Sequence, residues 1–449
     1  MNIYRLINNI SSLQAFQVLR FISFTIISVY FTQSPLSVDQ IGDYEFLLFI
    51  ASAVSFFWVT GFIQSLLPLY NSNNVFHHQK SRSTRRSPEI FNAFILLTGF
   101  SILMVVILFG MRHSIFINAE IKSLPYSNLL LLYILISNPA CLVEYIYLLR
   151  NKGVKLLNYG LLTFTMQTSF VCVPVAMGYG LEGGLWGLVI SSVFRILWLS
   201  VMMFRYAEFT FSFEYLKMHF RLGLPLILST LLSGSAQYID GIIVSLNFSP
   251  ADFAYFRYGA KEMPLVVMLA SGLNNAMLPE FYSATKMQSA LTSIKERSRR
   301  LMHVLFPLTI ILMLFTNDIY HALFTQRFAR SADVFMIYLL LITSRMLFPQ
   351  TILIGIKQTR IVLFASMIEI ILNVSLSLIL IPEYGIVGVA LATVIVYIIE
   401  KLILMGFNYH KFGIKPNEYT PVKTYLIYTV IVITLFVLID HRIIMLPRR

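Results

Sequence analysis

Charged residues are scarce in this sequence, and their scarcity excludes most soluble folds. Only 12% of the 449 residues are Asp, Glu, Lys or Arg, whereas 57% are hydrophobic. Soluble globular domains carry about 25% charged and about 45–50% apolar residues. A soluble chain of this length would need far more polar surface to cover itself. The composition therefore predicts a protein embedded in a membrane.

Segments of alternating polarity are also lacking, which argues against the strands of a membrane β-barrel. Apolar runs of about 20 residues recur instead, each long enough to cross a hydrocarbon core of about 30 Å as a helix. We predict an all-α polytopic membrane protein with thirteen spans, the last of them short. The spans are expected at 11–31, 44–70, 90–111, 126–149, 156–178, 184–204, 222–246, 252–280, 301–323, 331–355, 361–381, 385–408 and 424–439.

Motifs for nucleotide or metal chemistry are missing as well. There is no P-loop and no HExxH sequence. The only two cysteines, Cys141 and Cys172, fall inside expected spans without a metal or redox spacing. Residues 178–183 match GxGxxG, but they lie between two apolar runs, so we interpret them as a tight turn. We expect no cofactor and no metal site beyond an unidentified coupling ion, either H⁺ or Na⁺.

The net charge of +13 is explained by membrane topology rather than by nucleic-acid binding. With a cytoplasmic N-terminus, 21 of the 34 Lys and Arg residues lie in segments on the cytoplasmic side, and seven lie outside. Such a bias is typical of the cytoplasmic loops of membrane proteins. The first apolar run is longer than the core of a signal peptide and has no small-residue cleavage site, so it is interpreted as the first span.

The two halves of the sequence repeat at a distance of six spans. Three pairs of segments match in residue type and spacing: 34–35 with 249–250, 61–68 with 272–279, and 179–183 with 384–388. Because six is even, the halves share one orientation, as in transporters with a cavity between two bundles. We expect an N-terminal six-helix bundle, a cytoplasmic linker, a C-terminal six-helix bundle, and a cytoplasmic loop with an extra membrane helix, at 1–206, 207–221, 222–408 and 409–449.

Ionisable residues inside spans are costly and normally face a cavity or a partner. Near mid-depth we count four cations, Arg20, Arg195, Lys261 and Arg345, against the single carboxylate of Glu369. This surplus predicts a water-filled cationic cavity that receives an anion. The alternative is that the charges form ion pairs that fix helix packing.

Two further relations are expected around the seventh and eighth spans. Arg257 and Lys261 are four residues apart and would share one helix face. Asp240 and Arg257 lie at similar depth in adjacent spans, which would allow an ion pair. Glu144, Glu400 and Lys401 lie nearer the cytoplasmic ends of their spans, where long side chains can reach the interface.

At these positions the sequence resembles the Wzx-type oligosaccharide flippases of the MOP (MATE-like) transporter superfamily. The resemblance covers the first twelve spans and consists of scattered positions. They are Arg20, Ile41–Tyr44, Gly223–Pro225, Asp240, Tyr258–Glu262, Leu278–Glu280, Asn373 and Leu380–Gly388.

The resemblance implies alternating access by two bundles and the transfer of a polyprenyl-pyrophosphate-linked oligosaccharide for surface polysaccharide or O-antigen synthesis. It also implies a location in the bacterial cytoplasmic membrane. Arg20, Lys261 and Arg257 would contact the anion, to which the depth argument adds Arg195 and Arg345. Asp240 and Glu369 are candidates for coupling or ion-pair carboxylates. Partners would be the lipid-linked oligosaccharide, membrane lipids and polysaccharide polymerase or assembly proteins, but no nucleic acid.

Two other functions remain open. One is a multidrug or cation antiporter of the same superfamily, which should favour carboxylates in its cavity. The other is a membrane-embedded glycan polymerase or glycosyltransferase, which needs catalytic acids or bases in a loop at the membrane surface. The expected outer loops contain no paired carboxylates at a useful spacing, so we do not expect an enzyme.

Overall fold

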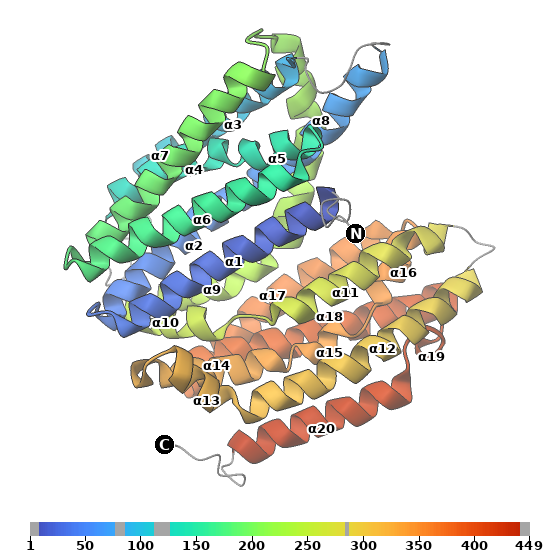
Figure 1. Ribbon diagram of the computed structural model, residues 1–449. Helices are drawn as coiled ribbons and strands as arrows, with labels where there is room; N and C mark the ends of the chain where they lie inside the picture. The colour runs from blue at the N-terminus through green and yellow to red at the C-terminus, as the bar shows by residue number, and fades with distance from the viewer. Residues whose placement is uncertain (1–8, 77–85, 112–125, 283–286, 441–449) are drawn as a thin grey trace, which may run out of the picture. The chain divides into compact units, whose positions relative to one another are not determined.

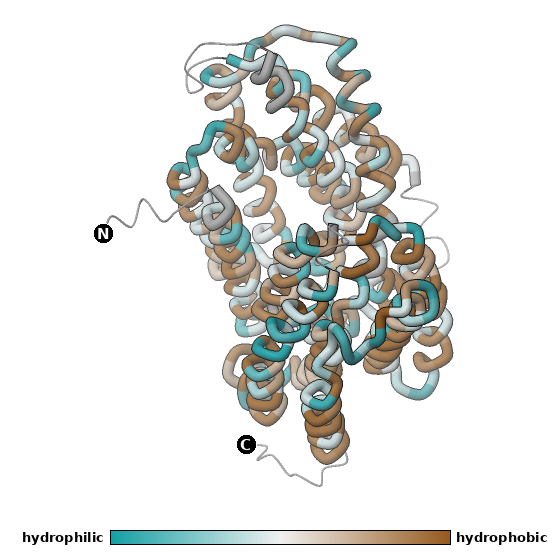
Figure 2. Tube along the Cα trace, turned by 90° about the vertical axis from the view of Figure 1, so that its right-hand side faces the viewer, coloured by the Kyte–Doolittle hydropathy of each residue, from teal (hydrophilic) through white to brown (hydrophobic). Residues whose placement is uncertain are grey.

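A computed structural model describes residues 9–76, 86–111, 126–282 and 287–440. Throughout these ranges the regular elements are helices, apart from one isolated bridge between Ser87 and Ala207. The predicted all-α fold is confirmed. The chain divides into two compact units, which we call the N-terminal unit (Met1–Gly234) and the C-terminal unit (Ser235–Arg449). In both units hydrophobic residues run along most of the helices (Figure 2).

The N-terminal unit consists of eight helices within its described residues (Figure 1). They are α1 (Asn9–Gln33), α2 (Val38–Phe76), α3 (Pro88–Met111), α4 (Ser127–Ala140), α5 (Leu142–Leu149), α6 (Gly153–Ala176), α7 (Gly180–Tyr206) and α8 (Phe213–Gly234). Helix α8 begins inside the expected linker, 207–221, and packs against α2. A Cβ atom on Gly61 of α2 would lie only 2.8 Å from the backbone nitrogen of Ile227, so this contact requires glycine.

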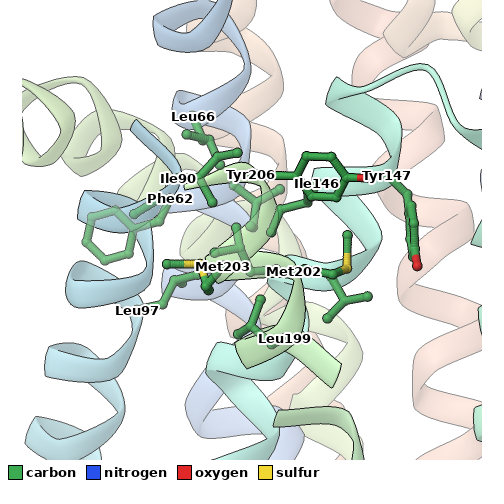
Figure 3. Packing of buried hydrophobic residues seen from close by; sticks show 14 of the residues in the cluster. Phe62, Leu66, Ile90, Leu97, Ile146, Tyr147, Leu199, Met202, Met203 and Tyr206 are labelled. Atoms are coloured by element: carbon green, nitrogen blue, oxygen red, sulfur yellow. The ribbon is translucent and has the colours of Figure 1, made fainter. Parts of the chain in front are cut away.

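Apolar side chains from α2, α3, α5 and α7 form the main core of this unit (Figure 3). Phe62, Ile146 and Leu199 are at most 1% exposed, and Met202 and Met203 fill the space between the helices. Met adapts to irregular gaps because its side chain is unbranched. This core holds the helices that carry the interior charges of the N-terminal unit.

The C-terminal unit contains shorter and more often broken helices. They are α9 (Ala236–Asn247), α10 (Pro250–Gly259), α11 (Pro264–Met277), η2 (Leu278–Tyr282), α12 (Met287–Leu314), α13 (Thr316–Leu323), η4 (Gln326–Phe328), α14 (Ala329–Leu339), α15 (Ile342–Arg345), α16 (Pro349–Gly355), α17 (Thr359–Tyr384), α18 (Ile386–Phe412), α19 (Pro416–Tyr419) and α20 (Val422–Asp440). Pro264 and Pro349 each begin a helix after a break, where the missing N–H of proline costs least.

Nine helical segments of the described chain are long and apolar enough to cross a membrane, and eleven if each of two bent helix pairs forms one span. The remaining two expected spans, 222–246 and 252–280, fall where the helices are interrupted, at Ser235 and at residues 260–263. The expected C-terminal helix is present as α20.

The repeated turns at 179–183 and 384–388 share a glycine with positive φ at the same position. Gly180 and Gly385 adopt φ values of +62° and +60°, a region that residues with a Cβ atom rarely adopt. The first turn joins α6 to α7 and the second joins α17 to α18, and each pair lies side by side (Figure 1). The repeat at 61–68 and 272–279 does not keep its environment, because Gly61 is tightly packed whereas Gly272 borders open space.

Candidate functional site

Arg20 of α1 and Glu144 of α5 form an ion pair inside the N-terminal unit. The side chain of Glu144 is 7% exposed, and that of Arg20 is 35% exposed. The guanidinium of Arg20 also lies over the rings of Phe16 and Phe164, at 5.3 and 5.9 Å from their centroids. Glu144 therefore acts as the partner of a mid-span cation, which its expected place near the membrane surface did not suggest.

Arg195 of α7 approaches the same phenyl ring from another helix. Its guanidinium carbon is 5.1 Å from the ring centroid of Phe164, and its Nη2 donates to Oε1 of Gln167 at 2.6 Å. The buried Nε of Arg195 and Nε2 of Gln167 have no hydrogen-bond partner among the described residues. Two arginines thus lie over Phe164, one of them paired with Glu144, and hydrogen-bond donors of Arg195 and Gln167 remain unused there.

In the C-terminal unit the span expected at 252–280 is interrupted. Helix α10 ends at Gly259 and α11 begins at Pro264, so Lys261 and Glu262 lie in a non-helical segment. The expected shared helix face of Arg257 and Lys261 is therefore wrong, because the spacing rule holds only within a continuous helix. The Nζ atom of Lys261 lies 4.9 Å from the ring centroid of Tyr258, while Arg257 is half-buried on α10.

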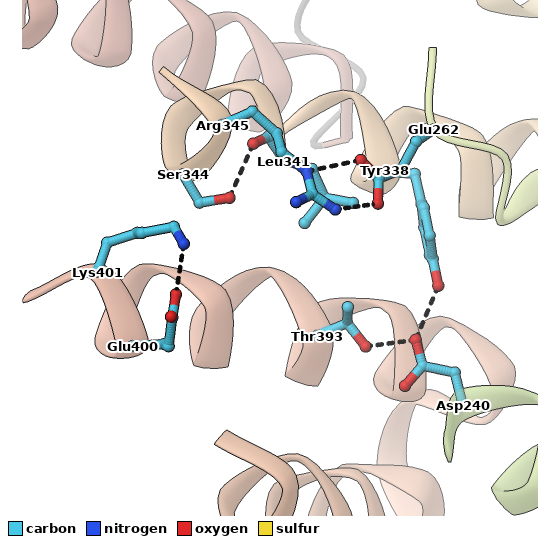
Figure 4. A network of polar contacts seen from close by, with 9 residues as sticks. All are labelled: Asp240, Glu262, Tyr338, Leu341, Ser344, Arg345, Thr393, Glu400 and Lys401. Carbon is cyan, nitrogen blue, oxygen red and sulfur yellow. Dashed lines mark hydrogen bonds and ion pairs between the residues drawn. The ribbon is translucent and has the colours of Figure 1, made fainter. Parts of the chain in front are cut away.

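Arg345 lies at the end of α15, directly before a second break at residues 346–348. Its Nε and Nη2 atoms donate to Oε2 and Oε1 of Glu262 at 2.8 and 2.5 Å. Figure 4 shows the two side chains facing one another in this bidentate ion pair. The guanidinium also lies 5.3 Å from the ring centroid of Tyr397.

Asp240 of α9 is buried and is held by hydroxyl groups (Figure 4). Its Oδ2 accepts hydrogen bonds from Tyr338 at 2.8 Å and from Thr393 at 2.6 Å, and Asn373 donates to Thr393 at 3.1 Å. Among the described residues, the contacts of this carboxylate do not include the ion pair with Arg257 that we expected. Its second oxygen, Oδ1, has no hydrogen-bond partner in the described chain.

Glu369 of α17 lies in a group of charges on neighbouring helices. Glu400 pairs with Lys401 at 2.7 Å (Figure 4), and both are close enough to Glu369 for their charges to act on it. Within the described residues, the carboxylate of Glu369 has neither a hydrogen-bond nor an ion-pair partner. These helices therefore bring Glu369 beside a second carboxylate and a lysine, which the sequence placed in different spans.

The tally of interior charges has to be revised. Glu144 neutralises Arg20, and Glu262 neutralises Arg345, so the surplus of four cations over one carboxylate is reduced. Glu262 falls inside the expected span 252–280 and should have been counted. The structure also adds Gln167, Tyr338 and Thr393, which sequence reasoning missed because uncharged polar residues are common in spans.

No group of three or more His, Cys, Asp and Glu side chains in the described ranges is arranged to hold a metal ion. Cys141 and Cys172 are both free thiols.

Residues 36–333 match the family described as polysaccharide biosynthesis protein, which covers about two thirds of the chain. The chain belongs to this family. No curated protein sequence matches it.

Solved structures show the same fold over nearly the whole length. The lipid II flippase MurJ in an inward closed conformation matches with a TM-score of 0.65 and 17% identity, covering 95% of this chain and 92% of MurJ. A multidrug resistance MATE family transporter of the MOP superfamily, in an inward-facing conformation, matches with a TM-score of 0.61 and 15% identity, covering 90% and 98%. The fold of this polysaccharide biosynthesis protein is thus that of MOP transporters, as the resemblance implied. It is a multi-pass membrane protein, and the two solved structures named above are a flippase and a transporter.

Proposed function

We propose that this protein is a flippase that moves a polyprenyl-pyrophosphate-linked oligosaccharide repeat unit across the bacterial cytoplasmic membrane. Its family supports a role in polysaccharide biosynthesis. Its fold is shared with a flippase for a lipid-linked precursor. The anionic pyrophosphate would need cations to cross the apolar core, since a bare charge there costs several kcal/mol or more.

The observation that carries the proposal is the pair of arginines around Phe164. Arg20 and Arg195 lie in the interior of the N-terminal unit, and among its described residues one carboxylate, Glu144, pairs with them, through Arg20. The donors left unused on Arg195 and Gln167 are suited to an incoming oxyanion. Guanidinium groups bind phosphate oxygens well because their N–H groups match the spacing of two oxygens.

In the C-terminal unit Lys261 and Arg257 would be the corresponding anion contacts. The two units would expose the substrate alternately to the two sides of the membrane, with the lipid tail remaining in the bilayer. Asp240 and Glu369 would couple this motion to an H⁺ or Na⁺ gradient. The N-terminus would be cytoplasmic, and a polymerase or assembly protein would receive the translocated unit.

The decisive experiment is a deletion strain that is complemented with variants and assayed for the leaflet that holds the lipid-linked oligosaccharide. We expect the deletion to trap complete units on the cytoplasmic side and to abolish surface glycan. Arg195→Ala and Arg20→Ala should fail to restore export, whereas Arg205→Ala, at the exposed end of the same helix as Arg195, should restore it. Normal glycan display by both interior variants would refute the cationic site.

A cation or drug antiporter is the second candidate. The C-terminal unit favours it, because Asp240, Glu369 and Glu400 bring three carboxylates into a unit whose fold is shared with a multidrug transporter. In that case the deletion would change drug or cation sensitivity and leave glycan export intact. Units that reach the outer leaflet but stay unpolymerised would instead indicate a membrane-embedded polymerase or glycosyltransferase.

A further inference from the structure

Two of the broken spans in the C-terminal unit are interrupted in a similar way. One break, at residues 260–263, separates α10 from α11, and the other, at residues 346–348, separates α15 from α16. Each following helix begins with a proline, Pro264 or Pro349. Interrupted helices at membrane depth are tolerated where they are buried in protein or line a cavity. The breaks are therefore encoded features of the sequence.

The halves of these spans pack in matched pairs. Helix α10 packs against α14, where a Cβ atom on Gly259 would lie 2.4 Å from the carbonyl oxygen of Ser331. Helix α16 packs against α11 and η2, where a Cβ atom on Gly355 would lie 2.3 Å from Cβ of Phe281. A further hydrogen bond from Thr351 links α16 to α11. Close packing thus occurs on both sides of the breaks, and α11 also contacts α15 across the second break.

The ion pair between Glu262 and Arg345 joins the two breaks through their side chains. Glu262 lies in the first non-helical segment, and Arg345 is the last residue before the second (Figure 4). A bidentate guanidinium–carboxylate pair fixes orientation as well as distance, because two parallel hydrogen bonds resist rotation. The side chains are 25% and 32% exposed, so the pair is partly shielded from solvent.

We propose that Glu262 is a positioning residue: its ion pair with Arg345 latches the two broken spans together and holds the neighbouring Lys261 in place. Arg345 then acts through Glu262 rather than as a direct anion contact. Without the latch, the α11–α16 pair can turn about the two non-helical segments relative to the α10–α14 pair. The importance of holding Lys261 rests on the proposed function, whereas the latch itself does not.

The test uses Lys261→Cys as a reporter in a full-length chain from which Cys141 and Cys172 have been replaced by alanine. The measured quantity is the rate at which a charged, membrane-impermeant thiol reagent modifies the reporter. We expect Glu262→Ala and Arg345→Ala each to change this rate by about tenfold, and the exchange Glu262→Arg with Arg345→Glu to return it to within about twofold. Export is measured in parallel without the reporter.

A matched control lies on two of the same helices. Arg330 of α14 pairs with Asp252 of α10 at 3.0 Å, but the side chain of Arg330 is 66% exposed. Arg330→Ala should change neither the labelling rate nor export, because exposed ion pairs contribute little. An equal effect of Arg330→Ala and Arg345→Ala on labelling would overturn the latch.

Milder variants keep the test valid if the alanine variants do not fold. Arg345→Lys and Glu262→Gln each retain part of the hydrogen bonding and should give intermediate labelling rates. The proposal is overturned if neither Arg345→Lys nor Glu262→Gln changes the labelling rate. It is also overturned if the charge-exchanged protein folds but its labelling rate differs from the original as much as that of the single variants. Loss of export with unchanged labelling would assign Arg345 to the substrate site and also overturn the latch. Changed labelling with normal export would support the latch and would show that export does not depend on the position of Lys261.

Discussion

The two units use the same helical hairpin with opposite interior charge. Arg195 lies fifteen residues after Gly180 of the first turn, and Glu400 lies fifteen residues after Gly385 of the second. Sixteen residues before the same glycines stand Phe164 and Glu369. A cation over a phenyl ring in the N-terminal unit thus corresponds to two neighbouring carboxylates in the C-terminal unit.

This difference shows that the two units can keep the same hairpin backbone while they carry different interior side chains. The hairpin needs a glycine with positive φ and closely packed helices, and both units keep these features. The interior side chains are free to differ because each unit provides its own partners. Arg195 finds Gln167 in the N-terminal unit, while Glu400 finds Lys401 in the C-terminal unit. At these matched positions the N-terminal unit therefore carries a cation, and the C-terminal unit carries carboxylates.

The largest expected effect comes from giving Arg195 the residue type of its counterpart in the C-terminal unit, Glu400. Arg195→Glu places a second carboxylate near Glu144 and removes the donor to Gln167. We expect export to fall by about 100-fold, since reversal of a partly buried charge costs several kcal/mol. Surface glycan quantified in the complemented deletion strain measures this effect. Arg205→Glu on the same helix is the control, and equal export by both variants would contradict the prediction.

A second test compares the two glycines that begin the segments 61–68 and 272–279. Gly61→Ala forces a Cβ atom against the backbone of Ile227, which cannot move like a side-chain tip, so we expect a loss of about 3 kcal/mol in stability. Gly272→Ala meets no atom within 4 Å and should be neutral or slightly stabilising. Thermal unfolding in detergent distinguishes the variants. Equal melting temperatures would show that the α2–α8 contact is looser than described.

The turn glycines should respond alike if the hairpins are equivalent. Gly180→Ala and Gly385→Ala meet no close neighbour, so their cost arises from the positive φ alone. We expect each to reduce the free energy of unfolding by about 1–2 kcal/mol. A clear difference between the two, measured by denaturant or thermal unfolding, would mean that the repeated turns are not equivalent.

The smallest expected effect concerns Glu369. Its carboxylate has no ion-pair partner within the described chain and lies near Glu400, so Glu369→Gln should stabilise the protein by about 1 kcal/mol or less. Glu296→Gln, which removes an exposed pair with Arg299, should leave stability unchanged. Destabilisation by Glu369→Gln in a melting experiment would reveal a partner for this carboxylate. If Glu369 couples transport to an ion gradient, the variant should also lose gradient-dependent export.

The elements that sequence reasoning predicted are those fixed by local chemistry. Apolar runs long enough for the bilayer indicated the helices, and the Tyr-Gly segments indicated two turns that each contain a glycine with positive φ. The breaks were missed, although Pro264 and Pro349 within two expected spans are a local signal. The continuous spans 252–280 and 331–355 were drawn through them, and Lys261 was consequently placed on a helix face that does not exist.

The sequence alone determined the membrane class, the helical fold and the internal repeat, because hydrophobic length, charge bias and glycine turns act over short distances along the chain. Only the tertiary structure decided how the interior charges are used. Arg20 meets Glu144 and Arg345 meets Glu262 across 124 and 83 residues. Such pairings depend on which helix faces come together, and a count of charges by depth contains no information about that.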